Sequence, residues 1–178
     1  LFDIPSAWFG CRVHYEEMGP EVLSSSSDIA SSWVYISAQS AASISPAMFD
    51  EFLQPYHERI ARLFTPGRIY FHGCEDLTRK YKVVKKTPGL RRFHVSPWSD
   101  FRVLGPEIGR DCVIERHVHP ANNILVFDEE QMRREVEENM EVGADLIMDL
   151  NLSDIHTVGH RPERLAQWAR IAQEVTER

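Results

Sequence analysis

Side chains able to bind a metal or to move protons recur at a spacing of two residues in this sequence. They pair as His72 with Cys74, His94 with Ser96, Asp149 with Asn151, and as the series Glu115, His117 and His119. Residues two apart on a β-strand lie on the same face, so each set would point to one side of its strand. In parallel α/β folds the carboxyl ends of the strands form one rim, and functional sites lie there. The spacing therefore predicts a site built from four strand ends.

His72 and Cys74 form the sharpest local pattern. A His-x-Cys pair offers one nitrogen and one sulfur from the same strand face, and this donor combination suits zinc. Zinc needs at least one more protein ligand, and the spacing leaves several candidates open. Those at the same rim are Glu75, His117, His119 and Asp149. Cys112 is a poor candidate, because it begins its predicted strand and so would lie at the opposite rim.

The elements that must position these side chains alternate between strands and helices. Runs of β-branched and aromatic residues predict strands at 33–36, 68–72, 92–95, 112–118 and 145–150. Capping residues and apolar periodicity predict helices at 46–64 with a kink at Pro55, at 76–86, at 99–104, at 128–142 and from 162 onward. This alternation predicts parallel strands with crossover helices. Five βα units fall short of a complete barrel of about 250 residues, which leaves a partial barrel or a smaller open sheet.

Two of the predicted helices carry apolar stripes that we interpret as core packing. The stripes are Met132, Val136 and Met140 in one, and Leu165, Trp168, Ala169, Ala172 and Val175 in the other. Their spacing of three and four residues is that of a single helix face. Asp128 is the predicted N-cap of the first helix, and Gly143 its stop signal.

Composition narrows the classes of partner. The chain has 178 residues, 43% hydrophobic and 26% charged, enough for one sizeable core. A net charge of −7 with scattered basic residues argues against nucleic acid, and no apolar run approaches the roughly 20 residues of a membrane span. Three cysteines without disulfide spacing favour a reducing, cytoplasmic location. The first residue is Leu1, so a targeting segment could precede it.

Several short motifs occur in a characteristic order from residue 37 to the end of the chain. They are Ser45-Pro46-Ala47-Met48-Phe49 with Pro55-Tyr56, then Ile69-Tyr70-Phe71-His72-Gly73-Cys74, Arg116-His117-Val118-His119-Pro120, Gly143-Ala144-Asp145 and Pro162-Glu163. Together they resemble the uroporphyrinogen decarboxylase family, which includes decarboxylases and zinc-dependent, corrinoid-linked methyltransferases. The segment ending in His72-Gly73-Cys74 is similar to the His-x-Cys zinc strand of the methyltransferase branch.

The resemblance implies an α/β fold that is a partial TIM-type barrel of parallel strands. Residues 1–32 would be a loop-rich lead-in, and 33–178 would correspond to the C-terminal half of the family fold. It also implies zinc and a corrinoid methyl carrier. The sequence departs from the family at two places: Asn151 stands where the methyltransferases carry a further cysteine ligand, and His117 and His119 replace a Gly-Asn-x-Asp-Pro motif.

Residues 9–22 and 28–29 resemble the early part of the same family. The units that follow them in the family, which carry the decarboxylase's catalytic aspartate, are missing near residues 28–33. Uroporphyrinogen decarboxylation by this chain alone is therefore not expected. The expected partners are a small-molecule substrate and a corrinoid protein. Either a second chain completes the barrel, or the protein is a reduced relative of the family.

Three functions remain open at this stage. The first is zinc-dependent methyl transfer, the second a metal-free, decarboxylase-like acid–base enzyme in which Arg116 holds a carboxylated substrate, and the third a non-catalytic barrel fragment. The site assignment is metal ligands His72, Cys74 and Glu75, catalytic groups His117, His119 and Asp149, and cofactor-binding residues Ser96 and Asn151.

Overall fold

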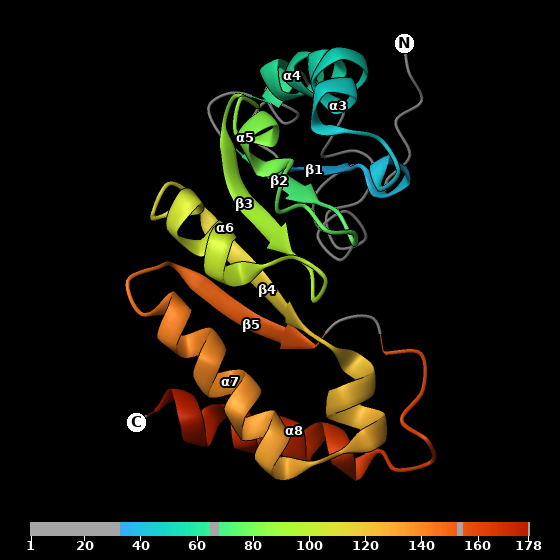
Figure 1. Ribbon diagram of the computed structural model, residues 1–178, viewed down its shortest axis with the longest axis vertical. Helices are drawn as coiled ribbons and strands as arrows, with labels where there is room; N and C mark the ends of the chain where they lie inside the picture. Colours follow the sequence, from blue (N-terminus) through green and yellow to red (C-terminus); the bar gives the residue numbers. More distant parts are fainter. Residues whose placement is uncertain (1–32, 65–67, 153–154, 178) are drawn as a thin grey trace, which may run out of the picture. The chain divides into compact units, whose positions relative to one another are not determined.

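The computed structural model describes residues 33–64, 68–152 and 155–177, and it divides the chain into two compact units. Unit 1 is Leu1–His94 and unit 2 is Val95–Arg178. In each unit strands alternate with helices, and the paired strands within a unit run parallel (Figure 1). This confirms the α/β class and the parallel βα units of a partial TIM-type barrel. The predicted lead-in at 1–32 lies outside the described residues.

Unit 1 is built on β1 (Val34–Ser37), β2 (Ile69–His72) and β3 (Leu90–Val95), whose last residue opens unit 2. The helices between them are α3 (Pro46–Phe52), α4 (Gln54–Ala61) and α5 (Tyr81–Val84), with short 3₁₀ turns at Gln39–Ala41 and Arg62–Phe64. β2 pairs with β1 on one side and with β3 on the other. The three predicted strands are therefore confirmed, each within two residues of its observed bounds.

Alternation along β2 separates a packed face from a polar one. Ile69 and Phe71 are fully buried, whereas Tyr70 and His72, which alternate with them, are half-buried. Phe71 stacks on Phe93 of β3, with ring centroids 5.9 Å apart, and its ring also contacts aromatic side chains of α3 and α4. Since successive residues of a strand point to opposite faces, the helices cover the Phe71 side and His72 points the other way.

Two helix predictions in unit 1 were wrong in extent. The expected helix 46–64 breaks at Leu53 into α3 and α4, because Pro55 has no N–H to continue the ladder and instead lies in the first turn of a new helix. The expected helix 76–86 shrinks to α5. The Asp76 carboxylate accepts the Thr78 N–H at 2.8 Å, and this local turn replaces the first helical turns.

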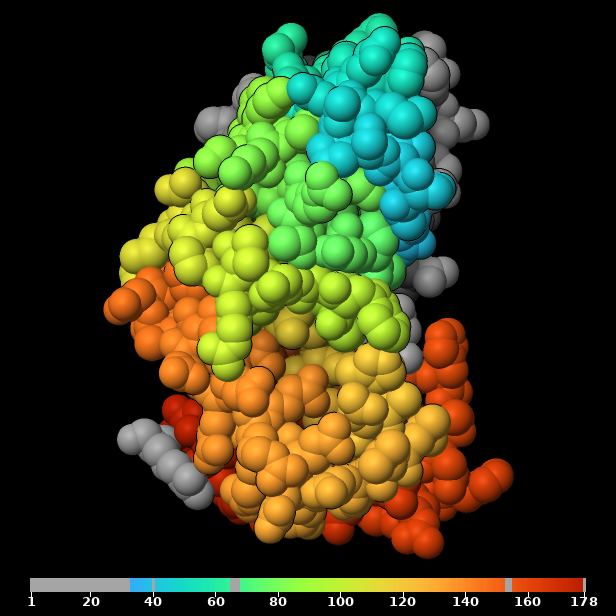
Figure 2. Space-filling model, in the orientation of Figure 1, coloured from blue at the N-terminus to red at the C-terminus, as the bar shows by residue number. Residues whose placement is uncertain are grey.

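Unit 2 contains β4 (Val113–Val118) and β5 (Met148–Leu152), paired in parallel. Its helices are α6 (Phe101–Ile108), α7 (Glu129–Gly143) and α8 (Glu163–Thr176), with a π-helical segment at Ala121–Val126. The α7 prediction is confirmed with its cap, since Asp128 accepts the Gln131 N–H at 3.0 Å. α7 and α8 lie side by side (Figure 1), and in space-filling form α7 (orange) packs against the π-helical segment (amber; Figure 2).

Two elements of unit 2 differ from their predicted bounds. α6 runs through Gly105-Pro106 and ends only at Gly109, whose φ is positive, because buried residues continue at helical spacing from Phe101 to Ile108. β5 begins at Met148 instead of residue 145. A turn in which the Leu146 N–H bonds to Gly143 first closes α7.

The buried faces predicted for α7 and α8 were partly wrong. Met132, Val136, Trp168 and Val175 are buried as predicted, together with Ile171, which the stripe omitted. Leu165 and Ala169 are exposed instead, and Met140 is only half-buried because Asn139 takes the inward position beside it. Within the described residues, no helix has both the length and the apolar character needed to cross a membrane.

His57 of α4 makes the stability of the fold depend on pH. It is 7% exposed against Phe49 and Phe71, and among the described residues its Nδ1 has no hydrogen-bond partner. Burial lowers the pKa of His57 from 6.5 to about 4. Between these values the unfolded chain binds a proton that the folded chain does not, so stability falls as the pH drops. We expect the free energy of unfolding to fall by about 2 kcal/mol between pH 8 and pH 5 through this group.

Urea unfolding at both pH values measures this effect. His57→Leu is expected to remove that part of the pH dependence, whereas replacement of the exposed His156 by glutamine keeps it. If the free energy of unfolding of His57→Leu fell with pH as steeply as that of the wild type, His57 would not be the cause of the pH dependence.

Candidate functional site

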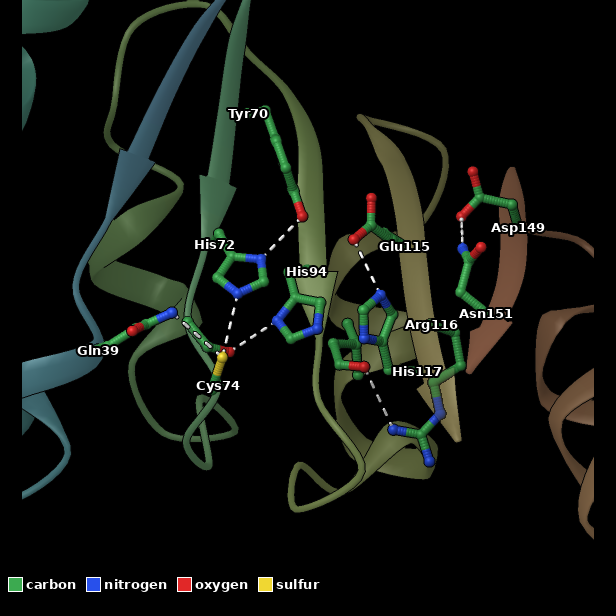
Figure 3. A network of polar contacts seen from close by, with 12 residues as sticks. Gln39, Tyr70, His72, Cys74, His94, Glu115, Arg116, His117, Asp149 and Asn151 are labelled. Carbon is green, nitrogen blue, oxygen red and sulfur yellow. Dashed lines mark hydrogen bonds and ion pairs between the residues drawn. The ribbon is translucent and has the colours of Figure 1, made fainter. Parts of the chain in front are cut away.

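His72 and Cys74 lie in direct contact at the carboxyl end of β2. His72 is the last residue of the strand, and its Nε2 is 3.1 Å from the Cys74 Sγ (Figure 3). The Gln39 side-chain amide, from the 3₁₀ turn after β1, donates to the same sulfur at 3.3 Å. A hydrogen-bond donor to a sulfur, here the Gln39 amide, stabilises the thiolate form, which is the nucleophile and the metal ligand.

Tyr70 orients the His72 ring from the same face of β2. Its hydroxyl is 2.8 Å from His72 Nδ1, and the two residues are two apart on the strand. The Tyr35 ring packs against both, at 5.3 Å between centroids in each case. With Nδ1 held by an oxygen, a neutral His72 can present the lone pair of Nε2 toward Cys74.

His94 of β3 packs against this pair. Its ring stacks on His72 with centroids 4.1 Å apart and an interplanar angle of 16°. Its Nδ1 donates to the Gly73 carbonyl at 2.7 Å, and the side chain is 1% exposed. The hydrogen bond to Gly73 and the ring stacking on His72 thus connect residues 72–74 to β3.

The His72–Cys74 pair suits zinc by donor chemistry and nearly by distance. Zn–N bonds of about 2.0–2.1 Å and Zn–S bonds of about 2.3 Å in tetrahedral geometry place the two donor atoms about 3.5 Å apart. The observed 3.1 Å is that of a hydrogen bond, and a small side-chain rotation covers the difference. His72 and Cys74 therefore fit two positions of a zinc site.

Glu75, the third predicted metal ligand, lies in a different environment. Its carboxylate is 3.9 Å from the ammonium group of Lys80, and both side chains are almost fully buried. Burial raises the pKa of Glu75, while its own backbone hydrogen bond and the Lys80 charge oppose that rise. Lys80 in turn donates to the Ala41 carbonyl at 2.6 Å. The role of Glu75 as a ligand stays a prediction.

In unit 2, β4 and β5 bring two polar pairs next to each other. His117 Nε2 donates to the Glu115 carboxylate at 3.0 Å, and Asn151 donates to the Asp149 carboxylate at 2.9 Å (Figure 3). In the parallel register, Glu115 pairs with Asp149 and His117 with Asn151. The side chains predicted from the spacing of two residues therefore lie on neighbouring strands. The two carboxylates among them are groups that can hold or move protons.

The other predicted residues of unit 2 lie apart from these pairs. Ser96 is fully buried and its hydroxyl is 3.2 Å from that of Ser99. His119 follows β4, and its ring meets the exposed Trp98 edge to face at 4.9 Å. Arg116 points to the opposite face of β4 from His117 and is 8% exposed, so its guanidinium is packed inside unit 2 and not presented to a substrate. The roles of Ser96 and His119 stay predictions.

Sequence reasoning missed Tyr70, Gln39 and the stacking of His94. Tyr70 had a usable signal, because it precedes His72 by two residues and so shares its face. Gln39 had none, since its contact with Cys74 joins residues 35 positions apart.

Comparison with known proteins agrees with this fold. A family model described as uroporphyrinogen decarboxylase (URO-D) matches residues 6–174. A search of curated proteins finds no match to the chain. The family match covers nearly the whole sequence, and the described strands and helices form the parallel βα units expected of it. The chain therefore belongs to the uroporphyrinogen decarboxylase family.

Proposed function

We propose that this chain is a zinc-dependent methyltransferase of the uroporphyrinogen decarboxylase family, which moves a methyl group from a corrinoid carrier to a thiol. The observation that carries the proposal is the His72–Cys74 pair at the end of β2, with Tyr70 on the second ring nitrogen and Gln39 on the sulfur. This is a nitrogen and a sulfur donor, each already oriented by a neighbouring side chain.

The chemistry assigns a task to each of these side chains. Bound zinc would act as a Lewis acid that keeps a substrate thiol ionised near neutral pH while it remains nucleophilic. His72 and Cys74 would hold the metal, and Tyr70 fixes the rotation of the His72 ring. The thiol gives its proton to solvent, and the thiolate sulfur then forms a bond to the methyl carbon. The bond from that carbon to its donor breaks, and the donor keeps the electron pair.

The polar pairs of unit 2 favour a second candidate, a metal-free acid–base enzyme of the decarboxylase type. The Glu115 and His117 side chains are 14% and 15% exposed and hydrogen-bonded to each other, and Asp149 lies opposite Glu115 on β5. A carboxylate that holds an imidazole in one tautomer is a common arrangement for proton transfer. In this candidate Asp149 and His117 handle the protons of a carboxylated substrate.

The proposal includes partners and a location. A corrinoid protein would supply the methyl group, a small-molecule thiol would accept it, and a second chain would complete the barrel. We expect the protein to act in the cytoplasm, where Cys74 would stay reduced.

Zinc content and methyl transfer test the proposal together. Protein purified without chelators is expected to hold about one zinc per chain, and to transfer the methyl group of methylcobalamin to a small thiol, followed by the change in cobalamin absorbance. Cys74→Ser is expected to weaken zinc binding at least about 100-fold, because it removes a thiolate ligand. Cys112→Ser is the matched control, since Cys112 is a buried cysteine outside the pair.

Two results would contradict the proposal. Zinc content near zero that Cys74→Ser leaves unaltered would exclude the metal site. A bell-shaped pH profile that is insensitive to chelators and depends on His117 would favour the acid–base enzyme.

A further inference from the structure

We propose that Lys80 is a positioning residue of the zinc site: its buried ammonium group holds the turn that carries Gln39 beside the loop that carries Cys74. The inference rests on the zinc-dependent function proposed above and deepens it, because Lys80 acts on the metal-binding sulfur through another side chain. Lys80 lies immediately before α5, and its side chain is 5% exposed. Lysines are almost never fully buried unless their charge is paired, so the groups around Lys80 indicate its task.

The first contact of Lys80 is with the turn that follows β1. Its Nζ donates to the Ala41 carbonyl at 2.6 Å and to the Ala42 carbonyl at 3.3 Å. Ala41 is the last residue of the 3₁₀ turn Gln39–Ala41, and Ala42 is its C-cap. Hydrogen bonds from an ammonium group are roughly twice as strong as those between neutral groups. Lys80 therefore fixes the end of this turn.

The second contact of Lys80 is with the loop that follows β2. Glu75 comes directly after Cys74 in the sequence, and its carboxylate lies 3.9 Å from the Lys80 Nζ. The Glu75 side chain is 9% exposed. Opposite charges at this distance attract each other several-fold more strongly inside a protein than in water. One ammonium group thus contacts both the turn after β1 and the loop after β2, and it sets the distance between them.

The contact between Gln39 and Cys74 depends on that distance. Gln39 donates to the sulfur at 3.3 Å from an exposed position, so its backbone, and not packing around its side chain, must place it there (Figure 3). The start of the turn is attached to β2, because the Ala38 N–H donates to the His72 carbonyl at 3.2 Å. The end of the turn is attached through Lys80. Loss of the ammonium group would therefore keep the turn but release the end next to Gln39.

Lys80→Met tests the inference, because it keeps the length of the side chain and removes the ammonium group. Metal-free wild type and variants are titrated with zinc in competition with a chromophoric chelator. We expect Lys80→Met to bind zinc about 10-fold more weakly, the lower end of the loss typical of partners outside the ligand shell. Removal of a positive charge by itself would act in the opposite direction and strengthen the binding of Zn²⁺. Lys82→Met, at an exposed position of α5, is the matched control and is expected to keep wild-type affinity.

A double-mutant cycle tests whether Lys80 acts through Gln39. Gln39→Leu is expected to weaken zinc binding about as much as Lys80→Met. The double variant is expected to bind zinc no more weakly than either single variant, because both substitutions remove the same hydrogen bond to the sulfur. A lysine with a merely structural role would change the affinity independently of Gln39, so losses that multiply in the double variant overturn the inference.

The side-chain amide protons of Gln39 provide a readout that needs no metal. In two-dimensional ¹⁵N–¹H spectra of the metal-free wild type, the proton bonded to the Cys74 sulfur is expected at a shift that differs from that of a solvated amide. Gln39→Leu identifies the signal by its loss. Lys80→Met is expected to move the signal to the position of a solvated glutamine, and Lys82→Met to leave it in place. An unchanged Gln39 signal in Lys80→Met overturns the inference.

The outcomes distinguish this inference from the proposed function. If the wild type binds no zinc, the proposed function fails, and the Gln39 signal alone decides whether Lys80 positions that side chain. If the wild type binds zinc and Lys80→Met has the same or a higher affinity, the inference fails and the proposed function stands. Should Lys80→Met fail to fold because the buried Glu75 carboxylate loses the Lys80 charge, the variant Lys80→Met/Glu75→Gln takes its place. It removes both charges, still lacks the donor to Ala41, and is compared with Glu75→Gln alone.

Discussion

Replacement of Arg116 by alanine is expected to lower the free energy of unfolding by about 2 to 4 kcal/mol, because a buried acceptor loses its donor and the packing of a long side chain is lost. Arg116 lies on the packed face of β4. Its Nε donates to Asn139 of α7 at 2.7 Å and its Nη1 to the Ser96 carbonyl at 2.5 Å. The guanidinium also lies over the Phe101 ring of α6, 5.3 Å from its centroid. One side chain thus connects β4 with three other segments of unit 2.

The cost arises from the groups that Arg116 leaves behind. Burial lowers the pKa of Arg116 to about 10, while the charges of Glu135 and Asp100 oppose that shift, so the group stays charged at pH 7. Alanine would leave the Asn139 amide oxygen without its donor, while the Ser96 carbonyl would keep only the Ser99 N–H, which it accepts at 3.1 Å. An unsatisfied buried acceptor costs about 1–3 kcal/mol, and the lost packing of the long side chain adds to it.

Chemical denaturation followed by circular dichroism measures this difference. Arg102→Ala is the matched control, because Arg102 is largely exposed and forms a surface ion pair with Glu138 at 3.9 Å. Loss of such a surface pair is expected to change stability by less than about 1 kcal/mol. Equal losses of unfolding free energy in the two variants would show that the buried contacts of Arg116 do not stabilise unit 2 more than a surface ion pair does.

Elements with strong local signals were predictable from the sequence. The Asp128 cap and the acidic residues of the first turn determine where α7 begins, and both act within a few residues of each other. Elements whose bounds depend on distant packing were not. β5 begins where the Ile114 N–H bonds to Ile147, a contact between residues 33 positions apart, and this moved the strand by three residues.

The same distinction applies to the candidate site. Spacing of two predicted that His72 and Cys74 lie on one side, and the alternation of strands and helices predicted that the strands of His117 and Asp149 are neighbours. Which groups bond to them depends on register and on loop paths. The Gly73 carbonyl, for example, is held by His94 from the neighbouring strand, and no local pattern near residue 73 indicates it.

Asn123 joins three segments of unit 2 through its side chain. It is fully buried in the π-helical segment, and its amide donates to the Glu135 carboxylate of α7 and to the His119 carbonyl, each at 2.8 Å. Its oxygen accepts the Trp168 indole N–H of α8 at 3.0 Å. All its side-chain bonds are therefore made inside the protein.

Asn123→Ala is expected to destabilise the protein by about 2 to 6 kcal/mol, because it removes the hydrogen-bond partner of two further groups, the Trp168 indole and the Glu135 carboxylate, at about 1–3 kcal/mol each. Urea unfolding monitored by circular dichroism provides the measurement. Asn122→Ala, at the half-buried neighbouring position, is the control and is expected to cost less than about 1 kcal/mol. Asn123→Asp refines the test: it keeps an acceptor for Trp168 but places a second carboxylate against Glu135. The repulsion between the two carboxylates is expected to add to the destabilisation at pH 7. A destabilisation by Asn123→Ala no greater than that by Asn122→Ala would mean that the amide network does not hold α8 to the rest of unit 2.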